Sequence, residues 1–221
     1  MKVKPAANIL SANDAIASDN RRLFRENGVF VINLMSSPGA GKTTLLEETI
    51  ARLSGSIKIA VIEGDVATRA DALRIEKTGV PAVQINTGNL CHLDAGMVRS
   101  ALSEFDIKSL DMLIVENVGN LVCPAEFNVG EDCKAMLLSA AEGDDKPLKY
   151  PLMFHESSAL VINKTDLIPH TNFSLEKARR DALSINPKLA VFPLSCRTGE
   201  GLEDWCGWLA DRIGENRCLR G

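Results

Sequence analysis

One short stretch of the chain has the composition of a phosphate-binding loop. Residues 36–43 read SSPGAGKT and lie between a β-branched apolar run and a segment with helical apolar spacing. The glycines allow backbone N–H groups to turn toward a phosphate chain at the positive end of a helix. Lys42 is expected to reach the β- and γ-phosphates, and the Thr43 hydroxyl to ligate Mg²⁺. The residues expected to bind the nucleotide from this loop are Pro38, Gly39, Ala40, Gly41, Lys42, Thr43 and Thr44.

This loop departs from the usual motif at one position. Ser36 stands where the first glycine is expected, so the loop must begin with backbone angles that a serine can adopt.

A second motif, NKTD at residues 163–166, specifies the base. The Asp166 carboxylate can accept two hydrogen bonds from guanine, and adenine lacks that pair of donors, so GTP and GDP are the expected ligands. Asn163 is expected to brace the phosphate loop, and the Lys164 stem to cover one face of the base. Ser195 and Cys196 follow a later strand, where the Cys196 backbone N–H is offered to the guanine carbonyl oxygen.

Acidic residues at strand ends are expected to serve Mg²⁺ and hydrolysis. Glu116 and Gly119 stand where many guanine-nucleotide switches have Asp-x-x-Gly, and the Gly119 N–H would sense the γ-phosphate. Asp65 and Glu116 join Thr43 as the expected Mg²⁺ partners. Asp71 is a candidate to orient the attacking water, although a solvated loop carboxylate explains it equally well. No glutamine near Gly119 is placed to position water, so slow turnover is expected.

The catalytic residues expected from these motifs are Lys42, Thr43, Asp71, Glu116 and Gly119.

Three soft ligands form a candidate transition-metal site. Cys91, His92 and Cys123 all follow predicted strands, on the nucleotide side of the sheet. Thiolate and imidazole suit Zn²⁺ or Ni²⁺, and three donors leave a position for water or for a second chain. A packing role for the adjacent Cys-His pair is the alternative. The remaining cysteines are expected to be core or incidental surface residues: Cys133, Cys196, Cys206 and Cys218.

The elements that position these residues alternate between strand and helix. Strands are predicted at residues 29–35, 57–65, 80–90, 112–115, 158–163 and 189–195, and helices at 11–27, from 44 onward, and at 67–77, 94–104, 174–184 and 201–213. Residues 126–150 read as irregular, with a turn at 143–147. This alternation predicts an α/β fold, a mostly parallel sheet with helices on both faces.

Two parts of the chain are distinguished on this pattern. Residues 1–28 are predicted to form an N-terminal helical extension, capped by Ser11 and closed by Gly28, and residues 29–221 a P-loop GTPase domain with an embedded metal site.

Composition narrows the class of partner. With 25 basic and 29 acidic residues among 221, the net charge of −4 argues against nucleic acid or an anionic membrane as the main partner. No apolar run approaches the roughly 20 residues of a membrane span, and the first residues lack a signal-peptide core, so a cytoplasmic location is expected. Six cysteines without a dense framework favour reduced thiols.

Taken together, the motifs resemble one family. The stretches MSSPGAGKTTLL, VIEGDVAT, NTGNLCHLDA, IVENVGNLVCPAEF, INKTDL and SCRTGEGL are similar to the nickel-incorporation GTPases of nickel–iron hydrogenase maturation, HypB, in the metallochaperone branch of P-loop GTPases. The resemblance implies a GTP-dependent homodimer that holds metal at Cys91, His92 and Cys123 and helps deliver nickel to a hydrogenase large-subunit precursor. It also implies a small nickel- and zinc-binding accessory protein as partner. Residues before the phosphate loop show neither the cysteine-rich motif nor the histidine-rich tract that some relatives carry.

Three other readings remain open on the sequence. A urease accessory GTPase shares the fold, but its nickel ligands fall in a Cys-Pro-His motif, whereas this chain has Cys91-His92 and Cys123-Pro124-Ala125. A small-molecule kinase with a phosphate loop would leave Cys91 and His92 as packing residues, and the NKTD motif argues against it. A scaffold that binds nucleotide without hydrolysing it would be separated by single-turnover hydrolysis.

Overall fold

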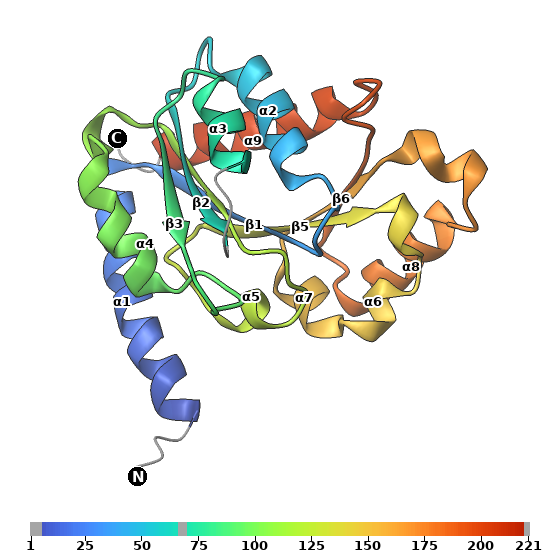
Figure 1. Ribbon diagram of the computed structural model, residues 1–221, viewed down its shortest axis with the longest axis horizontal. Coiled ribbons are helices and arrows are strands. Elements are labelled where there is room, and N and C mark those ends of the chain that lie inside the picture. Colours follow the sequence, from blue (N-terminus) through green and yellow to red (C-terminus); the bar gives the residue numbers. More distant parts are fainter. Residues whose placement is uncertain (1–5, 66–69, 219–221) are drawn as a thin grey trace.

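A computed structural model describes residues 6–65 and 70–218 of the chain. Its centre is a seven-stranded parallel sheet in the order β3-β2-β4-β1-β5-β6-β7 (Figure 1). The strands are β1 (Phe30–Ser36), β2 (Ile59–Asp65), β3 (Ala82–Asn86), β4 (Met112–Glu116), β5 (Cys133–Ser139), β6 (Ala159–Asn163) and β7 (Ala190–Pro193). The predicted α/β class with a mostly parallel sheet is confirmed.

Helices cover both faces of this sheet (Figure 1). They are α1 (Ala6–Asn27), α2 (Lys42–Leu53), α3 (Ala70–Glu76), α4 (Ala95–Ala101), α5 (Cys123–Glu126), α6 (Lys146–Lys149), α7 (Pro151–Glu156), α8 (Leu175–Ile185) and α9 (Leu202–Cys218). One core lies under α2, α3 and α9, and the opposite face packs on α1 and α4 beside α5, α7 and α8. Within the described ranges, no helix combines the length and apolarity needed to cross a membrane.

Side chains along the central strands point alternately to the two faces of the sheet and pack against the helices on each face. In β1, Ile32 and Leu34 face α2 and α9, whereas Val31 faces α1 and α4 and Met35 faces α5 and α7. The strand is buried along its whole length, as expected for a central strand of a parallel sheet covered on both sides. Because all strands run in one direction, their carboxyl ends meet at one edge, and the candidate site lies there.

Helix α1 differs from its prediction at its start. It begins at Ala6, so Ser11 lies inside the helix and is not its N-cap. The sequence AANIL before Ser11 contains good helix formers, which extend the helix past the serine. Its predicted end is confirmed: Gly28 has φ 51°, and the N–H groups of Gly28 and Val29 donate to the carbonyls of Arg25 and Phe24.

The prediction that residues 126–150 are irregular is wrong, because they contain the central strand β5. β5 pairs with β1 on one side and β6 on the other. Lys134 and Glu131 made this stretch look polar, but both side chains are buried, and Lys134 Nζ donates to the Ala125 carbonyl at 2.7 Å. The expected turn is partly replaced by α6, although Gly143 does adopt a positive φ of 88°.

A fully buried amide helps to fasten helix α1 to the rest of the fold. Asn20 is fully buried, and its Nδ2 donates to the carbonyls of Ala95 at 2.9 Å and Val129 at 3.0 Å. The helix therefore connects α4 with the segment that enters β5.

Replacing this amide is expected to destabilise the fold. Asn20→Ala removes two buried hydrogen bonds, so the free energy of unfolding should fall by about 1–3 kcal/mol in urea titrations. Asp19→Ala is the matched control, since Asp19 is exposed and pairs only with exposed Arg22, and its effect should stay within about 0.5 kcal/mol. Equal effects of the two substitutions would contradict the anchoring role.

Candidate functional site

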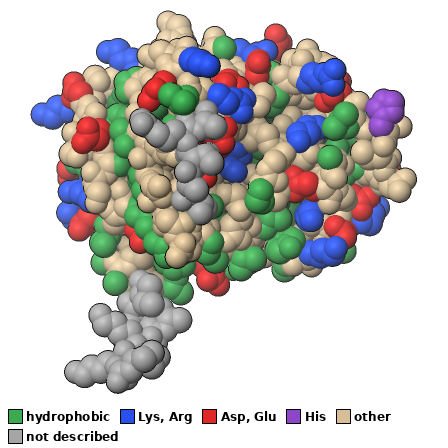
Figure 2. All heavy atoms as spheres, viewed as in Figure 1, with side chains coloured by type: hydrophobic (Ala, Val, Ile, Leu, Met, Phe, Trp, Pro, Cys, Tyr) green, Lys and Arg blue, Asp and Glu red, His purple; other side chains and the backbone are tan. Residues whose placement is uncertain are grey.

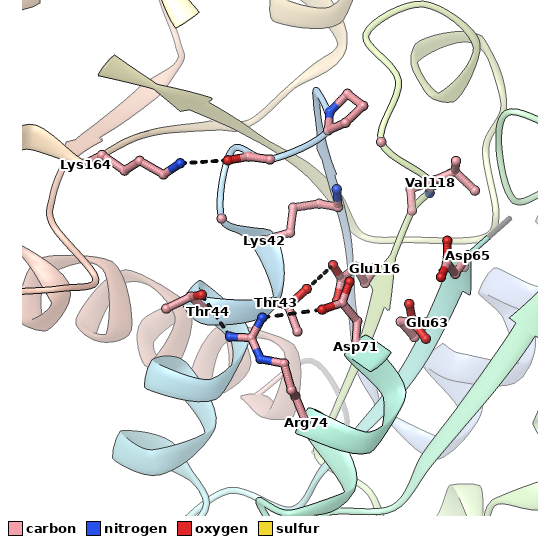
Figure 3. A pocket seen from close by; sticks show the side chains of 16 residues that line it. Lys42, Thr43, Thr44, Glu63, Asp65, Asp71, Arg74, Glu116, Val118 and Lys164 are labelled. Atoms are coloured by element: carbon pink, nitrogen blue, oxygen red, sulfur yellow. Dashed lines mark hydrogen bonds and ion pairs between the residues drawn. The ribbon is translucent and has the colours of Figure 1, made fainter. Parts of the chain in front are cut away.

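The phosphate loop connects β1 to α2 and depends on two glycines. Gly39 has φ 77° and Gly41 φ 102°, both in the region that favours glycine. A Cβ on Gly41 would also lie 2.6 Å from Asn163 Nδ2. The expected bracing contact is present: Asn163 Nδ2 donates to the Ala40 carbonyl at 3.0 Å, and Lys164 Nζ donates to the Gly39 carbonyl at 2.7 Å (Figure 3). Any side chain at position 41 would disrupt this bracing.

A cavity of about 570 Å³ opens in front of this loop. It brings together most of the residues predicted for phosphate, Mg²⁺ and hydrolysis. Its lining comprises Pro38, Gly39, Gly41, Lys42, Thr43, Thr44, Glu63, Gly64, Asp65, Asp71, Arg74, Glu116, Asn117, Val118, Gly119 and Lys164. Asp166, Ser195 and Cys196 lie outside this lining, in the segments that follow β6 and β7.

Lys42 occupies the floor of the cavity. Its Nζ donates to Ser36 Oγ at 2.9 Å, so the serine that replaces the usual first glycine supplies an acceptor for the lysine. Burial lowers the pKa of Lys42, and the carboxylates of Glu116, Asp71 and Glu142 act in the opposite direction. The hydrogen-bond partner of Lys42 is thus a neutral hydroxyl, and a phosphate group in the cavity would give the lysine a negatively charged partner.

Thr43 and Glu116 form the expected pair for Mg²⁺. The Thr43 hydroxyl donates to Glu116 Oε1 at 3.0 Å (Figure 3). Glu116 is buried at the end of β4, and burial raises the pKa of its carboxyl to about 7, against the effects of Lys42 and the Thr43 hydroxyl. Its Oε2 is buried without a hydrogen-bond partner in the described part of the chain. Oxygen donors of this kind fit Mg²⁺, which takes one or two carboxylates along with phosphate oxygens and water.

A further carboxylate, Glu63, is not among the site residues expected from the sequence. It lies near the carboxyl end of β2, just before Gly64 and Asp65, and it is 3 % exposed. Burial, and after it the neighbouring Glu116, raise the pKa of Glu63 to about 8. Its place at the carboxyl end of a strand was the available signal, but of this strand end only Asp65 was assigned to Mg²⁺.

Arg74 is a second cavity residue that the motifs did not indicate. It pairs with Asp71 at 3.4 Å and with Glu47, and its Nη2 donates to Thr44 Oγ1 at 2.9 Å. These contacts fasten α3 to the start of α2. Asp71 consequently sits at the rim of the cavity, held by a guanidinium (Figure 3).

The two loops expected to bind the base are joined to each other. Ser195 Oγ donates to Asp166 Oδ1 at 2.6 Å, which fixes one oxygen of that carboxylate. The Cys196 N–H donates to Asn163 Oδ1 at 3.2 Å, so in this structure it is directed at Asn163 and is not free for a base. Lys164 has φ 61°, a positive value that permits its side chain to return over Gly39.

The loop after β4 touches both the phosphate loop and the candidate metal segment. A Cβ on Gly119 would lie 3.0 Å from backbone atoms of Pro38, so a side chain there would require the phosphate loop to shift. Asn117, which the motifs did not indicate, is 1 % exposed. Its Oδ1 accepts from the N–H groups of Leu93 at 2.9 Å and Val118 at 3.0 Å. Leu93 directly follows Cys91 and His92, so the Asn117 amide ties the segment that carries these two candidate ligands to the end of β4.

Cys91, His92 and Cys123 come together although the two cysteines are 32 positions apart. One ligand atom from each lies within 4.8 Å of the others, and the two Sγ atoms are 3.0 Å apart. The His92 ring packs against Phe127 with centroids 3.9 Å apart, and burial lowers the pKa of His92, which favours the neutral imidazole that binds metals. Cys91 is exposed, so the cluster is open to solvent.

Charged side chains of both signs lie on the face shown in Figure 2. Acidic and basic side chains are interspersed there, with hydrophobic side chains between them.

Known proteins are similar to this chain in both sequence and architecture. Residues 30–193 match the family model "CobW/HypB/UreG, nucleotide-binding domain". The hydrogenase maturation factor HypB of Azotobacter vinelandii is 52 % identical over 206 residues, which are 93 % of this chain and 68 % of that protein. The chain belongs to the HypB family.

Solved HypB structures agree with this assignment. HypB from Archaeoglobus fulgidus has a TM-score of 0.87 and 38 % identity, over 92 % of this chain and 99 % of that one. HypB from Helicobacter pylori, crystallised in complex with nickel, has a TM-score of 0.87 and 40 % identity, over 93 % of this chain and 96 % of that one. The resemblance to HypB drawn from the motifs is thus confirmed, together with the P-loop NTPase fold.

Thiol labelling can test the cluster in this HypB-family protein. Iodoacetamide reacts with thiolates, so exposed Cys91 should be labelled first, and Zn²⁺ or Ni²⁺ should slow labelling of Cys91 and Cys123 by about tenfold or more. Cys196 is the internal control, because burial raises its pKa to about 12 and it lies outside the cluster. Peptide mass spectrometry reads out each site. Metal-independent labelling of Cys91 and Cys123 would contradict a metal site there.

Proposed function

We propose that this protein is a GTP-hydrolysing metallochaperone that delivers nickel during maturation of nickel–iron hydrogenases. The observation that carries the proposal is the position of Cys123. It lies four residues after Gly119 on the loop that contacts the phosphate loop, and its Sγ is 3.0 Å from that of Cys91. A thiol–imidazole cluster and a nucleotide cavity thus share one loop in a member of the HypB family.

Guanine is the proposed base. Asp166 would accept its two donors, with one carboxylate oxygen steadied by Ser195 Oγ, and Lys164 would cover the ring from its position over Gly39. Cys196 would have to release Asn163 Oδ1 before its N–H could meet the guanine carbonyl oxygen.

Hydrolysis is proposed to depend on Lys42 and on a magnesium site at Thr43, Glu116 and Asp65. Magnesium, when bound, neutralises charge on the phosphate oxygens. Lys42 lies in the same cavity and would stabilise the charge that develops in the transition state. Asp71, at the rim beside Arg74, would orient the attacking water, and slow turnover is expected because no glutamine stands near Gly119.

Nickel or zinc is the proposed cargo of Cys91, His92 and Cys123. The ligand set combines two thiols with an imidazole, which suits either ion. Three protein donors leave one tetrahedral position open, and exposed Cys91 makes that position accessible. A second copy of the chain could complete it, which favours a homodimer. A small nickel- and zinc-binding accessory protein and the hydrogenase large-subunit precursor are the proposed partners in transfer.

The choice of guanine is testable at Asp166. Asp166→Asn should weaken GTP binding by on the order of 2–4 kcal/mol, because the amide cannot accept both donors, and should favour xanthosine nucleotides. Asp106→Asn is a matched control, since Asp106 is exposed near the amino end of β4, away from the site. Calorimetric affinities for both nucleotides provide the measurement. Undiminished GTP affinity in the Asp166 variant would exclude this base contact.

Coupling between nucleotide and metal tests the function itself. Nickel and zinc affinities should differ among the apo, GDP and GTP-analogue forms, with a coupling of ~1–3 kcal/mol, and each ligand should change the other's affinity by the same factor. Cys123→Ala should remove the difference, whereas Cys206→Ala, in α9, should preserve it. Identical metal affinities in all three forms of the unmodified protein would refute a nucleotide-controlled metal carrier.

A further inference from the structure

Two buried glutamates lie side by side at the carboxyl edge of the sheet. Glu63 on β2 and Glu116 on β4 are register partners, and they are 3 % and 4 % exposed. Each has an Oε2 buried without a hydrogen-bond partner in the described part of the chain. Both line the nucleotide cavity, where Glu116 accepts from the Thr43 hydroxyl and Glu63 lies near Asp65 (Figure 3).

The nearby cations do not pair with these oxygens. Lys42 Nζ donates to Ser36 Oγ, and Arg74 is engaged by Glu47, Asp71 and Thr44. No ion pair within the described ranges includes Glu63 or Glu116. Two neighbouring buried carboxylates cost free energy unless they are neutralised or share a cation. Their arrangement therefore calls for a positively charged ligand between the strands.

We propose that Glu63 is a further residue of the divalent-cation site, holding Mg²⁺ together with Glu116. This inference rests on the proposed function, because the cation is the one that accompanies GTP or GDP. Mg²⁺ accepts one or two carboxylates beside phosphate oxygens and water. Glu63 and Glu116 would be these two carboxylates, Asp65 would contact the ion through one of its waters, and Thr43 adds a hydroxyl. The side chain at position 63 thereby sets how firmly the cation is retained.

Retention should matter most in the GDP state. GTP supplies oxygens of both its β- and γ-phosphates to the cation, whereas GDP has lost the γ-phosphate. The protein carboxylates then carry a larger share of the coordination. Glu63 is consequently expected to act more strongly on Mg²⁺ in the GDP complex than in the complex with a GTP analogue.

The test measures Mg²⁺ directly. Fluorescent GDP, or a fluorescent non-hydrolysable GTP analogue, is bound in EDTA and titrated with MgCl₂, and electron paramagnetic resonance of Mn²⁺ reports the bound ion. Glu63→Gln should raise the Mg²⁺ midpoint of the GDP complex about tenfold, and that of the analogue complex less. GDP affinity in EDTA should not fall, because no phosphate contact is lost.

Glu47→Gln is the matched control. It removes the same charge beside the same cavity, where Glu47 is paired with the cavity residue Arg74. Its Mg²⁺ midpoint should stay within about twofold of the wild-type value, since its carboxylate is not part of the cation site. Should Glu63→Gln fail to fold by circular dichroism, Glu63→Asp takes its place, since it retracts the carboxylate by one methylene and should also raise the midpoint.

Two results would overturn the inference while leaving the proposed function intact. One is an unchanged midpoint in the Glu63 variant, with wild-type protein that still binds GDP in a Mg²⁺-dependent manner. The other is an equal shift in Glu47→Gln, which would indicate a general charge effect. Wild-type protein that binds no guanine nucleotide, or binds it without any response to Mg²⁺, would overturn the proposed function together with this inference.

Discussion

The side-chain amide of Asn117 is the contact on which both halves of the site depend. Its oxygen holds the backbone of Leu93 and Val118, and its nitrogen donates to Asn33 Oδ1 on β1 at 3.1 Å. A buried amide with both ends satisfied has little freedom to move, because breaking either end would leave polar groups unpaired. The segment that carries His92 is therefore held in a fixed position relative to the strand that carries Glu116.

The same buried network reaches the segment that carries Cys123. Asn33 Nδ2 donates to Glu131 Oε1 at 3.4 Å, Glu131 lies 3.8 Å from Lys134 Nζ, and Lys134 donates to the carbonyl of Ala125 near Cys123. Both cysteine-bearing segments thus attach to one set of polar side chains inside the sheet. This arrangement explains how a solvent-open cluster can keep its three ligand atoms close together without a disulfide.

The nucleotide cavity is electrostatically incomplete by itself. Burial opposes the charged forms of Lys42, Glu63 and Glu116, since it lowers the pKa of the lysine and raises those of the glutamates. Phosphate would compensate the lysine, and a divalent cation would compensate the carboxylates. The protein accordingly keeps a strongly polar site next to the apolar core that lies under α2, α3 and α9.

Local signals in the sequence were enough to predict the main chemical motifs of this protein and most of its strands and helices. The phosphate loop, the NKTD motif and the paired Cys91 and His92 each consist of neighbouring residues, so their chemistry could be read without a fold. Most of the strands and helices followed from apolar periodicity, which also depends only on neighbours. The start of α1 was missed because the residues before Ser11 also form helix, so the serine does not cap it. The strand β5 was missed because Glu131 and Lys134 are charged in the sequence but buried in the fold.

Only the tertiary structure decided which distant residues meet. The strand order places β4 between β1 and β2, and this order makes Glu63 a neighbour of Glu116. The same order brings the loops after β3 and β4 together, so that Cys91 meets Cys123. Strand order is set by packing among all layers of the fold, and no short stretch of sequence encodes it. The sequence therefore named most of the chemical groups, and the sheet determined which of them act together.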